Sequence, residues 1–222
     1  MSLTKEQLVA IMPKTASQAD RLVMALNTAA TRYKINSKSR LAAWLAQVAH
    51  ESGQLQFKVE SLNYKVDALV PTFGLNRITQ AQAKQFGRID NVQAADQKAI
   101  ANIVYGGEWG RKNLGNIGPN DGWNYRGRGP IQLTGLGNYK AAGSALGLDL
   151  VNNPEQLEIP ENAIMAAAWY WAQNGLNELA DGGQAKFQDI GSIINTGKKG
   201  RVPKGADDRL AYYNKAIKVL SA

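Results

Sequence analysis

The amino-acid sequence predicts a mainly α-helical fold that is interrupted by one long glycine-rich segment. Along most of the 222 residues, apolar side chains recur at intervals of three and four, which is the spacing of one helix face. Capping residues, prolines and glycines bound these stretches at the points where helices begin and end. Only residues 131–134, Ile-Gln-Leu-Thr, alternate like a short strand.

The N-terminal residues carry clear signals for the start of a helix. Thr4 and Gln7 fit a capping box, and Leu3 with Leu8 fits a hydrophobic staple. We expect a helix here that Pro13 limits, because proline cannot continue a helix interior.

A second helix is expected from Ser17 or Asp20, and a third from about Ser39. The third helix ends near Ser52-Gly53, because glycine can adopt the left-handed conformation that closes a helix. Its apolar stripe consists of Leu41, Trp44, Leu45 and Val48.

More helices are expected in the rest of the chain. One opens at a second capping box, Thr79 with Gln82, and another opens at Pro160, since proline suits the first helical position. Apolar residues at helical spacing predict the others over residues 94–104, 139–146, 187–194 and 210–220.

The segment from Tyr105 to Gly135 differs from the rest of the chain. It is rich in glycine, contains Trp109, Trp123 and Tyr125, and shows no helical period. Irregular segments of this length inside a compact domain are usually functional or disordered, and the aromatic residues favour a function. We expect this insertion to line a cleft.

Composition excludes several classes of protein. The chain has no cysteine and a single histidine, His50, so disulfides are impossible and a metal site built on His and Cys is not expected. No window approaches the roughly 18 apolar residues of a membrane span, and the N-terminus shows no signal-peptide pattern.

The net charge of +8 suits either an ordinary basic surface or attraction to a polyanion. Nucleic acid is not an expected partner, because the main basic cluster contains no aromatic residues on which bases could stack. That cluster consists of Lys198, Lys199, Arg201 and Lys204.

Glu51 is the first candidate for catalysis. It follows Val48 by three residues and Trp44 by seven, so it lies on the apolar face of the third helix, at the C-terminal end. Partial burial and the negative end of the helix dipole both disfavour a charged carboxylate. The general acid of a glycosidase needs a carboxyl that keeps its proton, although a solvent-facing glutamate would show the same spacing.

Glu60 is the second candidate. Gly53 breaks the helix between the two glutamates, so the chain can fold back and place them across a cleft. Inverting glycosidases use two carboxyls roughly 6.5–9.5 Å apart, with room for a water between them. A surface charge is the alternative for Glu60, and His50 is expected to orient the cleft.

Residues 123–134, Trp-Asn-Tyr-Arg-Gly-Arg-Gly-Pro-Ile-Gln-Leu-Thr, combine aromatic rings, amides, a hydroxyl and glycines. Rings stack on sugar faces, amides and hydroxyls bond sugar oxygens, and glycine lets the backbone approach a ligand. The pattern of a phosphate-binding loop is absent. The composition favours a sugar site, with core packing of Trp123 and Tyr125 as the alternative.

These residues together resemble glycoside hydrolase family 19, and within it the phage endolysin branch. The motifs that carry the resemblance are residues 49–52 (Ala-His-Glu-Ser), Glu60, residues 124–134, residues 193–195 and residues 208–213. The resemblance runs from about Ala42 to the C-terminus. It implies a lysozyme-like helical fold and hydrolysis of a β-1,4-linked amino-sugar polymer with inversion and without a cofactor.

The resemblance implies that Glu51 is the general acid and Glu60 the base, with Thr134 helping to hold the attacking water. It implies sugar contacts for Gln132, Asn138 and Asn195, and support of the cleft for Tyr125 and Arg209. We add His50 to these substrate-binding residues. Plant members have a longer gap between the two glutamates and carry disulfides, and their Asn-Gly-Gly is Asn195-Thr196-Gly197 here.

The expected protein is a muramidase-type endolysin of phage or prophage origin, a monomer with one catalytic domain over residues 1–222 and no separate wall-binding domain. It would cleave peptidoglycan between N-acetylmuramic acid and N-acetylglucosamine and lyse bacterial cells. Its positive charge would attract it to an anionic envelope. It would be made in the host cytoplasm without a signal peptide and reach the wall once another protein opens the membrane.

Three alternatives remain open. A chitinase would use the same catalytic pair on N-acetylglucosamine polymers. A non-catalytic binding module would keep the cleft and lose turnover. Membrane disruption by the basic C-terminal helix is the third, although the mixed charge of that helix favours packing against the core.

Overall fold

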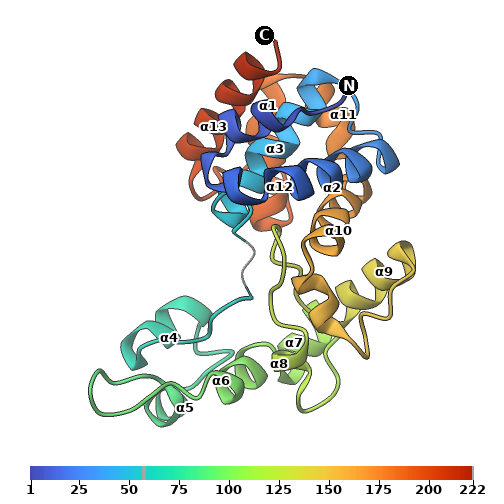
Figure 1. Ribbon diagram of the computed structural model, residues 1–222. Helices are drawn as coiled ribbons and strands as arrows, with labels where there is room; N and C mark the ends of the chain where they lie inside the picture. The colour runs from blue at the N-terminus through green and yellow to red at the C-terminus, as the bar shows by residue number, and fades with distance from the viewer. Residues whose placement is uncertain (57–58, 222) are drawn as a thin grey trace. The chain divides into compact units, whose positions relative to one another are not determined.

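The computed structural model describes residues 1–56 and 59–221 (Figure 1). The chain divides into two compact units. Unit 1 comprises the described part of residues 1–58, 129–131 and 156–222, and unit 2 comprises residues 59–128 and 132–155. Because the chain passes repeatedly from one unit to the other, neither unit is a continuous stretch of sequence, and the single catalytic domain stays a prediction.

Unit 1 is built around helix α3 (Lys38–Ser52), which packs most extensively against α13 (Ala206–Val219). A second pair is formed by α2 (Ala19–Arg32) and α10 (Pro160–Gln173). The other elements with residues in this unit are α1 (Lys5–Ile11), η1 (Pro13–Gln18), η2 (Pro154–Glu158), α11 (Leu176–Asp181) and α12 (Gln184–Thr196).

Helix α3 is enclosed by its neighbours, and its composition explains how. All residues from Leu41 to Ala49 are buried, and many of them are alanines, which allow helices to approach closely. Trp44 fills the centre of the unit with 1% of its surface exposed. The Ser37 hydroxyl caps the start by accepting from the Arg40 backbone N–H, and Gly53 closes the end at φ 58°.

Unit 2 is built from shorter helices. They are α4 (Val66–Phe73), α5 (Gln80–Phe86), α6 (Gln97–Val104), α7 (Gly107–Leu114), α8 (Asp121–Asn124) and α9 (Leu136–Leu146). One cluster of buried apolar residues in this unit consists of Leu62, Leu69, Ile78, Ala83, Ile100, Ala101 and Val104. In Figure 1 these helices run from green-blue α4 to yellow α9.

The predicted helix signals are confirmed where side chains make the cap. Thr4 with Gln7 and Thr79 with Gln82 both form complete capping boxes. Pro160 occupies the first turn of α10. In each case a local hydrogen bond or a fixed φ angle determines the start of the helix, so a few residues are sufficient to predict it.

The prediction of no helix between Tyr105 and Gly135 is wrong, because α7 and α8 lie there. The glycines in these helices allow other parts of the backbone to approach closely and do not form a loop. A Cβ at Gly110 would lie 2.0 Å from the Tyr105 carbonyl oxygen, so only glycine fits. Helix α4 was also missed, and it contains Pro71, a residue that normally ends a helix.

The predicted strand over residues 131–134 is also wrong. Arg128 and Leu133 form an isolated antiparallel bridge, and Gln132 between them has φ 52°, in the left-handed region, which a strand cannot accommodate. The fold is otherwise mainly helical, as predicted. No helix in residues 1–56 and 59–221 is both long and apolar enough to cross a membrane.

The contact between α6 and α8 depends on Gly122. A Cβ at this position would lie 2.3 Å from the Ala101 carbonyl oxygen. We expect Gly122→Ala to lower the free energy of unfolding by about 1–3 kcal/mol, because backbone must move to admit the methyl group. Urea unfolding measures this loss.

The matched control for this substitution is Gly182→Ala. Its Cβ would lie 2.6 Å from Cγ of Lys186, a side chain that can turn away, and 3.2 Å from the Leu179 carbonyl oxygen, so the free energy of unfolding should fall less than in Gly122→Ala. Equal stability of the Gly122→Ala variant and the control would contradict the tight contact of α6 with α8.

Candidate active site

Glu51 lies in the last turn of α3 and forms an ion pair with Arg209 of α13. Nη2 of Arg209 donates to Oε1 of Glu51 at 2.5 Å. The Arg209 side chain is 2% exposed and that of Glu51 is 20% exposed. The apolar surroundings expected from helix spacing are therefore replaced by a buried cation, which the sequence pattern did not reveal.

Arg209 uses the rest of its guanidinium to join three elements. Nη1 donates to Oε1 of Gln47 at 2.5 Å, and Nε donates to the Lys204 carbonyl at 3.0 Å. Gln47 lies one helical turn before Glu51, so the same α3 face supplies both acceptors. A fork of fixed planar donors holds each acceptor in a defined direction.

His50, next to Glu51, contacts α13 as well. Its Nδ1 lies 2.6 Å from Oδ2 of Asp208, a hydrogen-bonding distance. Gly205 passes directly over the imidazole, and a Cβ there would lie 2.2 Å from the ring carbon Cε1. These contacts fit the expected orienting role of His50, and Asp208 is a partner that the sequence analysis did not identify.

Asn195, near the end of α12, fastens the basic loop. Its Oδ1 accepts from the Lys204 backbone N–H at 3.0 Å, and Lys204 in turn accepts from Arg209. The Ser192 hydroxyl donates to the Lys198 carbonyl at 2.6 Å and accepts from the Arg201 backbone N–H at 3.0 Å. The predicted sugar ligand Asn195 is exposed, but its side-chain oxygen is engaged within the protein.

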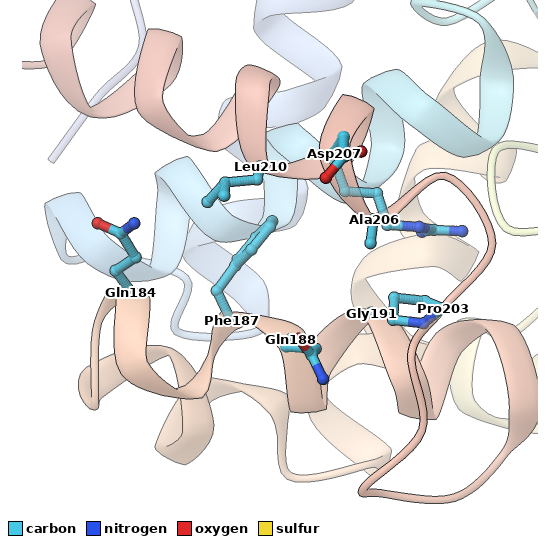
Figure 2. A pocket seen from close by; sticks show the side chains of 9 residues that line it. Gln184, Phe187, Gln188, Gly191, Pro203, Ala206, Asp207 and Leu210 are labelled. Carbon is cyan, nitrogen blue, oxygen red and sulfur yellow. The ribbon is translucent and has the colours of Figure 1, made fainter.

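A cavity of about 200 Å³ lies between α12 and α13 (Figure 2). Phe187 of α12 and Leu210 of α13 face each other across it. Arg209 also lines the cavity, on the side of Gly191 and Pro203. Neither Glu51 nor Asn195 is among the described residues that line it, so this cavity does not gather the predicted site.

Glu60, in unit 2, is held at both carboxylate oxygens. The Tyr105 hydroxyl donates to Oε1 at 2.5 Å, and the Gly127 backbone N–H donates to Oε2 at 3.1 Å. The Glu60 backbone N–H donates to the Gly127 carbonyl at 2.8 Å, so two residues far apart in sequence are joined by a reciprocal pair. The residue is half-buried and is not the plain surface charge of the alternative interpretation.

Gly127 brings Gln132 to the same place. A Cβ at Gly127 would lie 2.6 Å from Oε1 of Gln132 and 3.2 Å from Oε2 of Glu60. The glycine is therefore required by two side chains that converge on it. The structure thus groups Glu60 with Gln132, as the resemblance implied.

Thr134 and Asn138 follow Gln132 in one hydrogen-bonded series. The Thr134 hydroxyl donates to the Gln132 carbonyl at 2.9 Å, and the Asn138 side chain donates to the Thr134 carbonyl at 2.8 Å. Thr134 is half-buried and Asn138 is exposed. Both keep polar atoms for a further partner, and their roles in holding water and sugar stay predictions.

Tyr125 is placed beneath the surface. It is 7% exposed, it contacts the Tyr139 ring, and its hydroxyl donates to the Val151 carbonyl at 3.0 Å. Burial raises the pKa of its hydroxyl, with smaller effects from Asp121 and Asp149. This placement fits support of the cleft and the core-packing alternative better than direct contact with a sugar.

The predicted residues therefore form one cluster in each unit. His50, Glu51, Asn195 and Arg209 belong to unit 1, and Glu60, Tyr125, Gln132, Thr134 and Asn138 belong to unit 2. The described residues contain no group of three or more His, Cys, Asp or Glu side chains placed to hold a metal ion. Gln47, Asp208 and Tyr105 were missed because nothing in their local sequence marks them.

Comparison with known proteins points to one family. The family described as chitinase class I, glycoside hydrolase family 19, matches residues 113–181. A family 19 domain-containing protein of Haemophilus influenzae is 37% identical over 147 residues, 64% of this chain and 66% of the relative. Chitinase 11 of rice is 38% identical over 128 residues, 48% of this chain and 50% of the relative.

Solved structures give the same fold. Chitinase C of Streptomyces griseus matches with a TM-score of 0.58 and 22% identity, covering 99% of this chain and 77% of that chain. A bacterial family 19 chitinase matches with a TM-score of 0.56 and 24% identity, covering 99% of this chain and 95% of that chain.

The fold is the helical, lysozyme-like fold of these chitinases. Residues 113–181 match glycoside hydrolase family 19, and the chain is similar to members of that family over a longer stretch. It spans less than two thirds of the length of the curated relatives it matches, 66% and 50% for the two above. The phage endolysin branch stays a prediction.

The Arg209 network generates a test of stability. Arg209→Met leaves Glu51 without its cation and Gln47 without its donor in a buried place. We expect the free energy of unfolding to fall by about 3 kcal/mol, because acceptors on Glu51, Gln47 and Lys204 lose their common donor in a buried place. Urea unfolding at neutral pH measures the loss.

Arg21→Met is the matched control. It removes an equally short ion pair with Glu161, in which both side chains are exposed. Exposed pairs contribute less than about 1 kcal/mol, so this variant should be nearly as stable as the wild type. Equal losses in the two variants would show that the hydrogen bonds of Arg209 contribute no more to stability than an exposed ion pair.

Proposed function

We propose that this chain hydrolyses the β-1,4 bond of an N-acetylated amino-sugar polymer, with Glu51 as general acid and Glu60 as general base. The observation that carries the proposal is that each glutamate is held by its own set of hydrogen-bond donors, within a family 19 fold. Arg209 holds Glu51, and Tyr105 with Gly127 holds Glu60.

The chemistry follows that of inverting glycosidases. Glu51 gives its proton to the glycosidic oxygen while the bond from that oxygen to the anomeric carbon breaks. A water forms the new bond to the same carbon from the opposite face, and Glu60 takes the proton that the water loses. The anomeric configuration inverts, no covalent intermediate forms, and both glutamates then return to their starting protonation through solvent.

The contacts of Glu51 indicate which oxygen acts. Oε1 accepts from Arg209, and no other described residue bonds the Glu51 side chain. Oε2 is therefore the oxygen available to carry the proton that the glycosidic oxygen receives. Arg209 acts by orienting the carboxyl group, and His50 supports the same helix end through Asp208.

The remaining predicted residues have supporting parts in the proposal. The Thr134 hydroxyl would hold the attacking water beside Glu60, and Gln132 and Asn138 would bond sugar hydroxyl and acetamido groups. Asn195 would act mainly through the basic loop that it fastens. Tyr125, which is buried, would support residues 123–134 from the protein interior.

Chitin is the substrate that the comparisons favour, since the relatives and the solved structures are named chitinases. Peptidoglycan is the second candidate, favoured by the basic loop. Lys198, Lys199, Arg201 and Lys204 are all exposed, and they form no ion pair within the described residues. Peptidoglycan carries carboxylates and chitin does not, so this loop would attract only the former.

If peptidoglycan is the substrate, the protein would work as an endolysin. It would be made in a bacterial cytoplasm and would act on the cell wall after another protein opens the membrane.

Substitution of each glutamate tests the assignment. We expect Glu51→Gln and Glu60→Gln each to lower kcat at least about 100-fold, because each removes one proton-transfer step. Chitohexaose and purified peptidoglycan serve as substrates, with NMR of the first-formed anomer and mass spectrometry of the wall fragments. Glu6→Gln, in an exposed part of α1, is the control and should leave kcat unchanged.

The outcomes separate the candidates. Full turnover in the Glu51→Gln variant would reject the acid assignment. Cleavage of chitohexaose without release of wall fragments would select chitin over peptidoglycan. Binding without cleavage of either polymer by the wild type would reject catalysis and leave a binding module.

A separate prediction concerns the basic loop. Replacement of its four cations by glutamine should lower activity on peptidoglycan several-fold at low salt and leave activity on chitohexaose unchanged. Added salt of about 0.3 M should bring the wild type down to the level of the variant, because salt screens exposed charges. Initial rates on both substrates across a salt series measure this effect.

The control for the loop removes the same charge elsewhere. Exposed lysines of unit 2 are replaced by glutamine, namely Lys84, Lys98, Lys112 and Lys140. A loss on peptidoglycan as large as that of the loop variant would show that only net charge matters and would remove the loop from the proposal.

A further inference from the structure

The carboxylate of Glu60 is fixed by a hydroxyl that is itself embedded in the protein. Tyr105 follows the last residue of α6, and its hydroxyl donates to Oε1 of Glu60 at 2.5 Å. With the Gly127 backbone N–H on Oε2, each carboxylate oxygen has one donor, so the group cannot rotate without losing a hydrogen bond. Each oxygen still has a lone pair for another donor, such as a water.

Arg77 lies behind Tyr105 in a cage of aromatic rings. Its guanidinium carbon lies 3.7 Å from the ring centre of Trp109, 5.0 Å from that of Phe73 and 5.4 Å from that of Tyr105. Nε donates to the Val104 carbonyl at 2.7 Å, one residue before Tyr105. The guanidinium thus contacts both the ring and the backbone that carry the hydroxyl.

Arg77 has no carboxylate of its own. Among the described residues it forms no ion pair, and its Nη2 is buried without a hydrogen-bond partner. A buried cation left unpaired is costly, and cation–π contacts of about 0.5–2 kcal/mol offset only part of that cost. Packing alone does not explain the charge, since a methionine would fill similar space without it.

The titration of these groups agrees with an electrostatic link. Burial lowers the pKa of Arg77, and the negative charge of Glu60 is among the effects that oppose this lowering. Burial, followed by the charge of Glu60 and its hydrogen bond, raises the pKa of Tyr105. Tyr105 therefore stays protonated, and able to donate, throughout the range in which a carboxylate base works.

We propose that Tyr105 and Arg77 are positioning residues for Glu60. The Tyr105 hydroxyl fixes the direction of the carboxylate, and the caged Arg77 holds Tyr105 in place and puts a positive charge behind it. This inference rests on the proposed role of Glu60 as the base. Neither side chain needs to touch the sugar or the attacking water.

The proposal has a kinetic consequence. A base accepts a proton from water efficiently only when its lone pair points at the reacting oxygen, and a misplacement of about 1 Å can cost about 100-fold in rate. Loss of the positioning hydroxyl should therefore lower kcat and leave KM almost unchanged. Loss of a donor to the charged form should also make the carboxylate harder to ionise.

Tyr105→Phe is the direct test, because it removes one oxygen and keeps the ring that faces Arg77 and Phe73. On chitohexaose, or on purified peptidoglycan if the wild type cleaves only that polymer, we expect kcat to fall about tenfold or more and KM to change less than about twofold. The acidic limb of the pH–rate profile should move to higher pH. A thermal melt confirms that the variant is folded.

Tyr64→Phe is the matched control. Tyr64 packs against the other side of the same cluster, with its ring centre 5.1 Å from that of Phe73. Its hydroxyl forms no hydrogen bond with any residue that the structure describes. The kcat and the pH–rate profile of the Tyr64→Phe variant should match those of the wild type.

Two substitutions of Arg77 separate charge from packing. Arg77→Lys keeps the cation, and Arg77→Met keeps much of the volume without it. We expect the acidic limb to move to higher pH in the methionine variant and to return towards the wild-type position in the lysine variant. Identical profiles for the wild type and both variants would overturn the electrostatic part of the proposal.

The Glu60→Gln variant distinguishes failure of this inference from failure of the proposed function. If Glu60→Gln keeps full activity, Glu60 is not the base and both ideas fail together. If Glu60→Gln is inactive and Tyr105→Phe equals Tyr64→Phe in kcat and pH–rate profile, the base assignment stands and the positioning role alone is wrong.

Discussion

The hydrogen bonds of Arg209 are the interaction on which the rest of unit 1 depends. Burying a guanidinium is costly unless its donors are satisfied, and here one side chain bonds Glu51, Gln47 and the Lys204 carbonyl. These acceptors belong to α3 and to the loop before α13. The buried charge therefore links the helix that carries the proposed acid with the loop that carries the exposed cations. A neutral side chain at position 209 could fill the space but could not impose directions on three acceptors at once.

The fold was predictable from the sequence where the determining interactions are local. Capping boxes at Thr4 and Thr79, and the left-handed Gly53, involve residues within one turn of each other, so their spacing can be recognised directly. Prediction failed where tertiary contacts decide. Gly110 and Gly122 resemble loop residues in the sequence, yet both are required by backbone atoms of α6 and its end. The glycine-rich sequence therefore indicated an irregular insertion in a region that in fact contains closely packed helices.

In the candidate site, too, the sequence revealed local motifs and did not reveal tertiary contacts. The glutamates, Gln132 and Thr134 could be named because the short motifs in which they lie resemble those of family 19. The groups that hold the glutamates could not be named, because they are distant in sequence. Arg209 is 158 residues from Glu51, and Tyr105 is 45 residues from Glu60. No periodicity or composition encodes such pairs. The expectation of apolar surroundings for Glu51 failed for this reason, since helix spacing describes one helix and contains no information about the guanidinium that arrives from another.

The way the two glutamates are held also explains why the comparisons identify the family more sharply than the substrate. A cation orients Glu51, whereas a neutral hydroxyl and a backbone N–H orient Glu60. In the proposed mechanism both arrangements would act on the glycosidic bond and on water, which chitin and peptidoglycan have in common, so selection on either polymer would preserve them. What differs between the polymers is the charge of their substituents. In this chain the exposed cations lie in a loop that Asn195 and Arg209 fasten through Lys204. Under the proposed function, substrate preference would depend on a surface loop that can change in sequence while the buried network beneath it, and with it the chemistry, stays the same.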